Sequence, residues 1–470
     1  MTAPHPRRFD AIVVGGGLAG LAATQRLAAA GVHVALVEKR DRLGGSSAMS
    51  GGWFALSGTG VQRRAGVEDS DDVFLADMLE TGGGFADPSL LRALVAHQAH
   101  AVAAIDRADA WTDELKISAG MTIARAHLIR IRALLASLER EAVAAGATIL
   151  LGRPADALIA EDTRVTGIRS GEEVLAADAG VVLTTGGFSR SRELLGLFVP
   201  DQAAAMPYGG VGNTGDGLRM AWMLGAGLAD VGHVAGTYGQ HAEATDDEHE
   251  LLTANYLGAI LVNALGARFT DESESYKVLG SAVLSQPGRM AFQIFDSRVR
   301  ALSKPGVPLS DMERIEELGH LVSAPTLAEL GRRLELPPGT LEATVEQYNK
   351  TVEQYNKTVE PYNETVAGRA ADAFGRTGLV NGVGALLPVA RAPFYAYPAV
   401  TAMTSTFGGL SVAPDASVVR IDGSRIQGLF AAGEVVGGFH GASYMTGTAL
   451  TKALVFGVVA ADTIAGRPPG

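Results

Sequence analysis

The sequence contains no cysteine. Disulfides, thiolate-bound zinc, cysteine-ligated iron–sulfur clusters and thioether-linked haem are therefore excluded for this chain. Basic residues are also few, 39 against 51 acidic ones, which gives a formal net charge of −12. A chain of this charge lacks the basic face that nucleic acid or an anionic membrane surface would require. We therefore expect no nucleic-acid partner.

Long apolar runs are absent as well, because no stretch reaches the roughly 18 residues that a membrane span needs. The start, "MTAPHPRRFDAIVVGGG", has no separate hydrophobic segment before its first expected strand. We therefore expect a soluble cytoplasmic protein without a signal peptide. What the chain has in excess is glycine, with 59 residues among 470. Its length predicts two domains or one large split domain.

The first glycine cluster stands in "FDAIVVGGGLAGLAATQRLAAAGVHVALVEKR". An apolar strand leads to Gly15, Gly17 and Gly20 in G-x-G-x-x-G spacing, and a helix and a second strand ending at Glu38 follow. This strand–turn–helix–strand order distinguishes a dinucleotide fingerprint from a chance match. The glycines let a pyrophosphate approach the helix N-terminus. Glu38 can accept a hydrogen bond from a ribose hydroxyl.

In the stretch after Glu38, "KRDRLGGSSAMSGGWFALSG", a Gly-Gly pair is followed by two adjacent serines and then by another Gly-Gly pair. Such a loop of backbone amides and hydroxyls can hold the remainder of a long cofactor. A nicotinamide domain does not normally need it, so FAD is favoured over NAD. The candidate contacts here are Lys39, Gly45, Ser46, Ser47, Gly51 and Gly52.

Three later segments each place glycine and a polar residue where a strand or loop ends. They are "VVLTTGGF" with Thr185 and Gly186, "GVGNTGDG" with Asn213 and Asp216, and "LFAAGEVVGG" with Gly433 and Glu434. Each is weak alone, but in this order they support one cofactor site. Asp216 is also expected to be the N-cap of the helix that follows it.

With "RFTDE" (268–272), "FGGL" (407–410) and "FHGASYMTGTALTKALVFG" (439–457), the motifs resemble the FAD-dependent fumarate reductase, flavocytochrome c and 3-ketosteroid dehydrogenase flavoproteins over nearly the whole chain. The resemblance implies an α/β fold with a Rossmann-like FAD-binding domain of the glutathione-reductase type. That domain is expected at 1–231 and 405–470, with an α+β cap domain inserted at 232–404.

The resemblance also implies residue roles at the flavin. Gly433 and Glu434 would hold the ribityl chain, and Ala155 would be a further cofactor contact. The backbone amides of Thr448, Ala449 and Leu450 would lie at the pyrimidine edge, where a helix N-terminus stabilises the negative charge of reduced flavin.

The succinate dehydrogenase branch of this family carries its flavin on a histidine just before the second Gly-Gly pair. Here that stretch is "GGSSAMS", so we expect FAD to be bound non-covalently. The chain shows no second dinucleotide motif for NAD(P)H and no haem motif. A separate electron acceptor or donor is therefore expected, and no metal site.

Relatives that act on dicarboxylates hold them with histidines and arginines, because a buried carboxylate needs a paired cation. The corresponding positions here carry Tyr444, Ser405, Tyr276, and Thr237 with Tyr238 beside it. Hydroxyl groups have replaced the cations, so we do not expect a fumarate-type substrate.

Tyrosines at these positions resemble the ketosteroid dehydrogenase branch. There, one phenol donates to a ketone oxygen, a phenolate removes the α-proton, and the flavin takes hydride from the β-carbon. We expect Tyr444 and Tyr276 to form this pair, with Thr446 or the Thr448 backbone as auxiliary donor and Tyr238 in reserve. The expected activity is desaturation of a CH–CH bond beside a ketone, on a small cyclic or steroid-like substrate.

Two alternatives remain open. The chain can be an ene-reductase of an unsaturated ketone or acid, or a flavin electron-transfer protein without turnover of its own. Elsewhere, "TVEQYNKTVEQYNKTVEPYNE" (344–364) repeats valine and tyrosine at helical spacing, and Pro361 predicts the end of that helix. A coiled-coil role for this repeat is a further alternative. Trp111 is expected in a helix.

Overall fold

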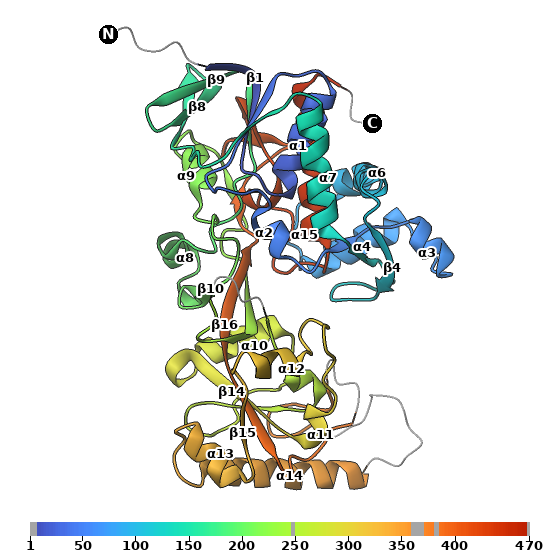
Figure 1. Ribbon diagram of the computed structural model, residues 1–470, viewed down its shortest axis with the longest axis vertical. Helices are drawn as coiled ribbons and strands as arrows, with labels where there is room; N and C mark the ends of the chain where they lie inside the picture. The colour runs from blue at the N-terminus through green and yellow to red at the C-terminus, as the bar shows by residue number, and fades with distance from the viewer. Residues whose placement is uncertain (1–6, 246–249, 359–370, 380–384, 468–470) are drawn as a thin grey trace. The chain divides into compact units, whose positions relative to one another are not determined.

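The computed structural model describes residues 7–245, 250–358, 371–379 and 385–467. The chain divides into two compact units. Unit 1 comprises residues 1–199, 209–235 and 405–470, and unit 2 comprises 200–208 and 236–404. The first and last parts of the chain therefore fold together, and most of the middle forms a body of its own (Figure 1).

Unit 1 is built on a sheet with strand order β18-β19-β8-β9-β1-β2-β6, in which β7 pairs with β8. The parallel strands are β1 (Arg7–Val14), β2 (Val34–Val37), β6 (Thr148–Leu150), β9 (Glu173–Leu183) and β19 (Arg425–Ala431). The antiparallel additions are β7 (Ala157–Glu161), β8 (Arg164–Ser170) and β18 (Ser417–Val419). The inner strands are apolar and buried, as strands covered on both faces must be.

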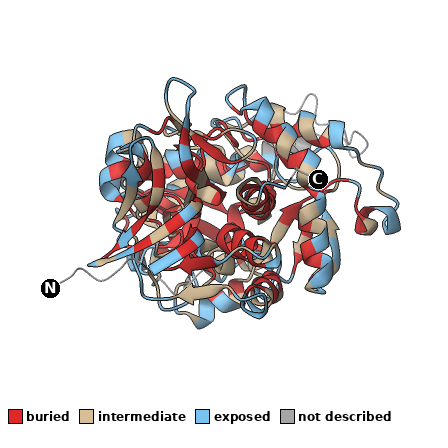
Figure 2. Cartoon of the chain, turned by 90° about the horizontal axis from the view of Figure 1, so that it is seen from above, coloured by how far each residue is buried: buried red, intermediate tan, exposed pale blue. Residues whose placement is uncertain are grey.

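Helix α1 (Leu18–Ala29) packs against α7 (Ile131–Ala144) and α15 (Thr448–Ile464), as Figure 1 shows. The contact between α1 and α15 is close, because a Cβ atom on Gly457 would lie 2.4 Å from the Ala19 carbonyl oxygen. In Figure 2, buried residues gather on the central strands and helices. Segments more than 400 residues apart in sequence thus share one core.

A second sheet in unit 1 consists of β3 (Trp53–Ala55), β4 (Trp111–Lys116) and β5 (Ala126–Ile129). The expectation that Trp111 lies in a helix was wrong: it begins β4 and pairs with Ile129 of β5. The helices between β2 and β4 in sequence are α2 (Gly45–Met49), α3 (Gly60–Arg64), α4 (Asp71–Thr81), α5 (Pro88–His97) and α6 (Ala99–Arg107). Unit 1 also contains α8 (Arg192–Phe198), α9 (Asp216–Trp222), β11 (Leu228–Ala229) and β17 (Gly409–Leu410).

A cluster of buried charged residues connects separate segments of unit 1. Arg125 has no exposed surface and donates to both carboxylate oxygens of Asp69, at 3.0 and 2.8 Å. A third bond reaches the carboxylate of Asp77, which also accepts from the amide and hydroxyl of Thr122. The guanidinium is therefore the cation that two buried acids share.

Unit 2 has a sheet of order β10-β16-β14-β13, to which β12 and β15 add by pairing with β16. The strands are β10 (Met206–Pro207), β12 (Val234–His241), β13 (Ile260–Val262), β14 (Met290–Asp296), β15 (Val322–Ala324) and β16 (Phe394–Thr406). The helices are α10 (Tyr276–Leu284), α11 (Ser297–Arg300), α12 (Met312–Glu317), α13 (Leu327–Arg333) and α14 (Thr340–Thr358).

Helix α14 contains the first two units of the heptad repeat, 344–350 and 351–357, and the first residue of the third. Val345, Tyr348 and Val352 are each 1% exposed and belong to a hydrophobic core cluster of unit 2. The Tyr348 hydroxyl donates to the Leu387 carbonyl oxygen at 3.1 Å. The predicted apolar helix face is confirmed for these residues and is covered within the unit. The rest of the third unit, which includes Pro361, lies outside the described residues.

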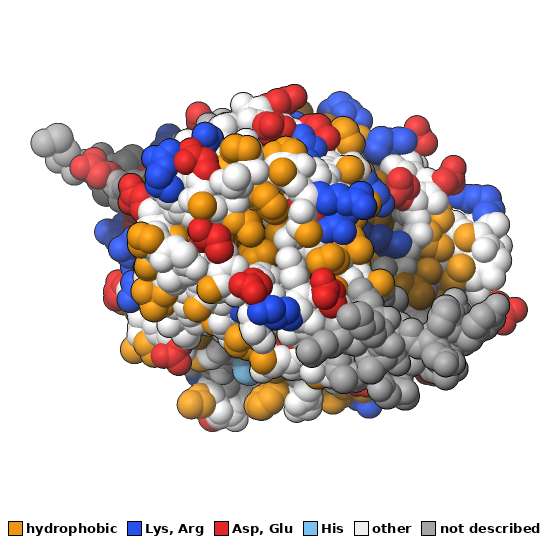
Figure 3. Space-filling model, turned by 90° about the horizontal axis from the view of Figure 1, so that it is seen from below, with side chains coloured by type: hydrophobic (Ala, Val, Ile, Leu, Met, Phe, Trp, Pro, Cys, Tyr) orange, Lys and Arg blue, Asp and Glu red, His pale blue; other side chains and the backbone are white. Residues whose placement is uncertain are grey.

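The surface carries charges of both signs. On the face drawn in Figure 3, acidic and basic side chains are interspersed with hydrophobic ones. Across the described ranges, no helix has both the length and the apolar character that a membrane crossing needs.

Replacing Arg125 with methionine should lower the free energy of unfolding by about 3–5 kcal/mol, because two buried carboxylates would lose their cation. Arg64→Met is the matched control, since the Arg64–Asp113 pair is exposed and such pairs contribute about 0–1 kcal/mol. Urea unfolding followed by circular dichroism measures both variants. An equal effect of the two substitutions would contradict the role given to the buried cluster.

Candidate functional site

The turn between β1 and α1 accepts only glycine at its key positions. Gly15 has φ +109°, and a Cβ atom there would lie 2.4 Å from the Thr184 carbonyl oxygen. A Cβ atom on Gly20 would lie 1.8 Å from the Gly15 carbonyl oxygen. Gly17 is the N-cap of α1, and its position provides no side-chain cap. The N-terminus of α1 thus presents backbone groups without a side-chain cap. This arrangement suits a pyrophosphate.

The two serines of the second glycine loop lie beside this turn. Gly44 N donates to the Gly16 carbonyl oxygen at 2.8 Å, which brings the start of α2 to the start of α1. Ser47 Oγ accepts from Leu18 N at 3.3 Å. Ser46 Oγ accepts from Asn213 Nδ2 at 3.1 Å. The loops expected to hold one cofactor therefore meet in space.

The other glycines of this loop have definite places. Gly45 is the first residue of α2, with φ +49°. Gly51 is exposed, and Gly52 has φ +74° and accepts from Ile129 N at 2.9 Å. The second Gly-Gly pair is thus fixed at the edge of the sheet that contains β3 and β5.

Glu38 lies beside the turn between β1 and α1. Its carboxylate accepts from Gly16 N at 2.7 Å and from Arg40 N at 2.8 Å. Each carboxylate oxygen keeps a second lone pair that a ribose hydroxyl can use. Ala155 lies in the segment that runs beside this residue, because Arg153 N donates to the Glu38 carbonyl oxygen at 2.9 Å.

Asp216 has a different role from the expected N-cap. The N-cap of α9 is Gly215, in the left-handed conformation at φ +78°, and Asp216 is the first helical residue. The carboxylate instead accepts from Lys39 Nζ at 2.6 Å and from Thr214 Oγ1 at 2.8 Å. A side chain at Gly215 would meet Leu194 at 2.3 Å, which explains why glycine occupies the cap.

Glu434 connects distant segments at the centre of the site. Its carboxylate accepts from Thr406 N at 3.0 Å and from Asn213 Nδ2 at 2.9 Å. A Cβ atom on Gly187 would lie 2.6 Å from Glu434 Oε1, so this glycine permits the approach. Burial raises the pKa of Glu434, and these hydrogen bonds act in the opposite direction.

Three further residues lie next to this network in the sequence. Gly433 and Gly186 both have positive φ, +81° and +75°. Thr185 Oγ1 is buried and has no hydrogen-bond partner among the residues that the structure describes.

Helix α15 also begins without a side-chain cap. Gly447 is its N-cap at φ +91° and gives no side-chain cap, while Thr448 N donates to the Met445 carbonyl oxygen at 3.2 Å. Within the described part of the chain, the amides of Ala449 and Leu450 have no acceptor. First-turn amides without partners are available to a ligand.

These features test whether the residues fit FAD. Two uncapped helix N-termini, the glycine cradle around Glu434, and the orphaned Thr185 hydroxyl all belong to unit 1. A long dinucleotide needs donors for its phosphates and for its ring edge, and the site supplies both. The residues therefore fit the cofactor.

The model of the FAD binding domain family matches residues 10–450. The chain belongs to this family. Among curated relatives, the NADH:fumarate oxidoreductase of Klebsiella pneumoniae is 28% identical over 99% of the chain, which spans about half (48%) of that relative. The probable fumarate reductase Ifc3 of Shewanella frigidimarina is 30% identical over 97% of the chain and 74% of its own length. The 4-oxocyclohexanecarboxylate 2-dehydrogenase of Sinomonas cyclohexanicum is 28% identical over 98% of the chain and 94% of its own length.

Solved structures agree with this assignment. The open conformation of a flavocytochrome c3 fumarate reductase superposes with a TM-score of 0.84 at 29% identity, over 99% of this chain and 79% of that one. A 3-ketosteroid Δ1-dehydrogenase from Sterolibacterium denitrificans gives 0.76 at 23% identity, over 98% and 100%, and shows a shared fold. The expected α/β class with a Rossmann-like FAD domain and a cap is confirmed. This family member is an FAD-dependent oxidoreductase.

The tyrosines expected to act on substrate lie in both units. Tyr444 belongs to unit 1 and is half-buried, with its ring centroid 5.5 Å from that of His440 and 5.6 Å from that of Phe407. Thr446 follows it, and its amide donates to the Ala119 carbonyl oxygen at 3.0 Å.

The other two tyrosines belong to unit 2. Tyr276 is the first residue of α10, and burial raises its pKa. Tyr238 is fully buried, and its hydroxyl donates to the Ala291 carbonyl oxygen at 3.1 Å. Desolvation raises the pKa of Tyr238 well above its ordinary value, so this residue is poorly suited to proton transfer with a substrate.

Two charged residues of unit 1 escaped the sequence analysis. Asp230 has φ +55° and accepts from Gly441 N at 3.1 Å. Lys452 lies in the apolar stretch of α15 and is 2% exposed. A lone lysine in "TALTKALVFG" was the available signal, because apolar helix faces rarely bury a cation.

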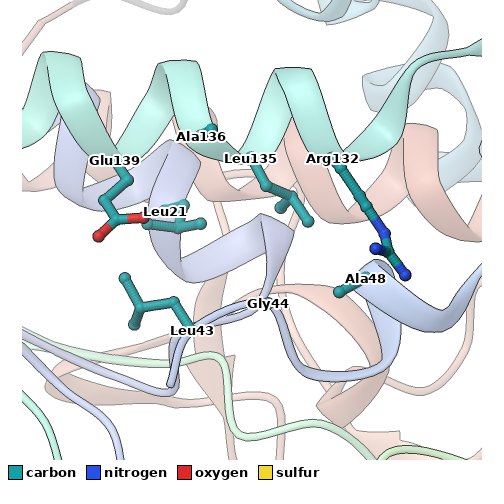
Figure 4. Close-up of a pocket in the computed structure, with 8 residues that line it drawn as sticks. All are labelled: Leu21, Leu43, Gly44, Ala48, Arg132, Leu135, Ala136 and Glu139. Carbon is teal, nitrogen blue, oxygen red and sulfur yellow. The ribbon is translucent and has the colours of Figure 1, made fainter. Parts of the chain in front are cut away.

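A small pocket lies next to the phosphate turn, between α1, α7 and the start of α2 (Figure 4). Its walls are Leu21, Leu43, Gly44, Ala48, Arg132, Leu135, Ala136 and Glu139. Its volume of about 170 Å³ is below the roughly 300 Å³ of ordinary small-molecule sites. None of the predicted site residues lines it.

Gly187→Ala should weaken FAD binding at least about tenfold, because the new methyl group would displace Glu434 and Thr406. Gly196→Ala is the matched control, since a Cβ atom at this glycine of α8 meets nothing within 4 Å. Fluorescence titration of the apoprotein with FAD measures both. Equal affinity of the two variants would contradict the role of the cradle.

Proposed function

We propose that the protein desaturates a carbon–carbon bond α,β to a ketone and passes the electrons to a separate acceptor. The observation that supports this is the set of residues at the substrate positions of the family: Tyr444, Ser405, Tyr276 and Thr237. All are uncharged hydroxyls. A dicarboxylate bound among them would lack its cation, which costs several kcal/mol.

Unit 2 supports the same proposal at one of these positions. The Thr237 and Thr404 hydroxyls lie 3.3 Å apart and interact with each other. Neither can neutralise a carboxylate, whereas either can donate to a ketone oxygen. A neutral oxygen-containing substrate therefore suits these groups.

In this proposal the substrate loses a proton from the α-carbon and a hydride from the β-carbon, and the product is the enone. Bound FAD, held non-covalently, supplies the hydride acceptor. The protein must polarise the ketone and remove the proton. Donors aimed at a developing oxyanion typically contribute about 3–4 kcal/mol each to such a reaction.

Tyr276 suits the donor role. Burial raises its pKa, so its hydroxyl stays protonated at neutral pH and can donate to the ketone oxygen. The role of proton acceptor then falls to Tyr444. This assignment rests on residue type, motif position and the local environment of each tyrosine.

Thr446 remains an auxiliary donor through its hydroxyl. The Thr448 backbone is less suited to that role, because its amide already donates to the Met445 carbonyl oxygen at 3.2 Å. Tyr238 is left out of the mechanism because its hydroxyl is committed to Ala291.

The names of relatives support a ketone. The Sinomonas relative, a 4-oxocyclohexanecarboxylate 2-dehydrogenase, matches this chain over 94% of its length, and the Sterolibacterium structure contains 1,4-androstadiene-3,17-dione. The fumarate reductase relatives favour the alternative, an ene-reductase that runs in the opposite direction.

Anaerobic titration of the holoenzyme separates these functions. Saturated cyclic ketones or 3-ketosteroids should bleach the oxidised flavin, and fumarate should reoxidise the reduced flavin slowly. Rapid reoxidation by an enone with no bleaching by ketones would establish the ene-reductase. Flavin unresponsive to both classes would indicate an electron-transfer protein.

Tyr444→Phe should lower kcat/KM for the ketone about 10²–10³-fold and leave the FAD dissociation constant unchanged, because only a reacting hydroxyl is lost. Tyr348→Phe is the control, since that hydroxyl bonds a carbonyl group within the core of unit 2. Steady-state kinetics with an artificial electron acceptor measures both. Wild-type turnover in Tyr444→Phe would remove this residue from the mechanism.

A further inference from the structure

The segment that carries Tyr444 is held on both sides by backbone hydrogen bonds within unit 1. Two residues before the tyrosine, Ala442 N donates to the Gly82 carbonyl oxygen at 3.1 Å. Two residues after it, Thr446 N donates to the Ala119 carbonyl oxygen at 3.0 Å. The backbone around the proposed proton acceptor therefore depends on two carbonyl groups that lie outside the flavin motifs.

The first of these acceptors is fixed by a helix. Gly82 is the C-cap of α4, and its amide donates to the Met78 carbonyl oxygen at 3.0 Å. A Cβ atom on Gly441 would lie 2.4 Å from the Gly82 carbonyl oxygen, so the two backbones are in close contact. The end of α4 thus sets the position of residues 441–442 directly.

The second acceptor lies in an irregular loop, residues 118–122, between β4 and β5. Thr122, at the end of this loop, connects it to α4. Its amide donates to Asp77 Oδ2 at 2.9 Å, and its hydroxyl lies 2.9 Å from both oxygens of the same carboxylate. Asp77 is 5% exposed and forms an ion pair with Arg125, so its carboxylate is a charged acceptor in a fixed place.

Gly120 brings the same loop against the residue that follows Tyr444. Its φ is +80°, and a Cβ atom there would lie 2.5 Å from Thr81 Oγ1 and 3.1 Å from Met445 Cα. Its carbonyl oxygen accepts from Thr81 Oγ1 at 3.3 Å. The loop therefore packs between the last residue of α4 and the Tyr444 segment, at a distance that only glycine permits.

We propose that Thr122 is a positioning residue that fixes the Tyr444 ring by holding loop 118–122 against α4 and against residues 445–446. Tyr444 then lies between two anchors, and Thr122 controls the second of them. The consequence for catalysis rests on the proposed function, whereas the anchoring of the segment does not.

Hydrogen–deuterium exchange of the holoenzyme, with fragmentation that resolves single amides, tests the anchoring. In Thr122→Val the Thr446 amide should exchange about tenfold faster, because the loop loses a hydrogen bond to a charged acceptor. The Ala442 amide should keep wild-type protection, since its acceptor belongs to α4 and not to the loop. Thr122→Ser is the conservative variant, and its hydroxyl should preserve wild-type exchange at both amides.

A second variant acts on the same loop through packing. Gly120→Ala should also speed exchange of the Thr446 amide, because the new methyl group would press on Thr81 and Met445. Gly31→Ala is the matched control, since Gly31 has the same φ of +80° and a Cβ atom there meets nothing within 4 Å. The two variants share the backbone strain and differ in the contact.

The proposal is overturned by wild-type exchange of the Thr446 amide in Thr122→Val, by equal loss of protection in Thr122→Val and Thr122→Ser, or by equal exchange in Gly120→Ala and Gly31→Ala. Loss of protection throughout unit 1 in Thr122→Val would also overturn it. In that case the threonine would support the whole fold and not one segment.

Turnover measurements separate this proposal from the proposed function. If ketones are turned over, Thr122→Val should lower kcat about tenfold and leave KM and the FAD dissociation constant within about twofold of wild type, because a displaced reacting group loses its alignment. Thr122→Ser should restore kcat. If ketones are not turned over, the proposed function fails, and the exchange results still decide whether Thr122 anchors the segment. Full ketone activity in Thr122→Val despite faster exchange would refute the effect on Tyr444 and leave the proposed function intact.

Discussion

The carboxylate of Glu434 is the contact on which the site of unit 1 depends. It receives hydrogen bonds from Asn213 and Thr406, and Gly187 leaves the space it occupies. These residues come from segments that are far apart in sequence. Because a partly buried carboxylate needs each of its donors, one side chain couples the arrangement of all these segments. The charge of Lys452 also lowers the pKa of this acid, against the effect of burial.

The parts of this site that could be predicted from sequence are those in which backbone approaches backbone. Gly15, Gly17 and Gly20 stand in a fixed spacing because no other residue fits the turn, so the sequence shows the constraint directly. Ser46 and Asn213 stand in two separate motifs that the sequence analysis assigned to one cofactor site, and a hydrogen bond of 3.1 Å joins their side chains. We predicted the α/β fold class and the FAD cofactor from these motifs.

The errors and omissions share a physical cause, since each depends on a partner that is distant in the chain. Trp111 begins a strand because Ile129 pairs with it, a contact that local periodicity does not reveal. Asp216 looks like a cap by its position before a helix, but Lys39 draws its carboxylate into a salt bridge. The hydrogen bond from Gly441 N to the Asp230 carboxylate joins residues 211 positions apart, and no sequence motif indicates it.

The split of unit 1 has a consequence for how the protein is made. Strand β19 lies beside β9 in the main sheet, and α15 packs against α1, yet both elements are synthesised after the whole of unit 2. The first 230 or so residues cannot complete their core until then, and the edge of β9 that β19 occupies stays open during synthesis. Unit 2 is contiguous apart from one short segment and is free of this delay. The candidate cofactor site needs Glu434 and the start of α15, so it stays incomplete until these elements have been synthesised.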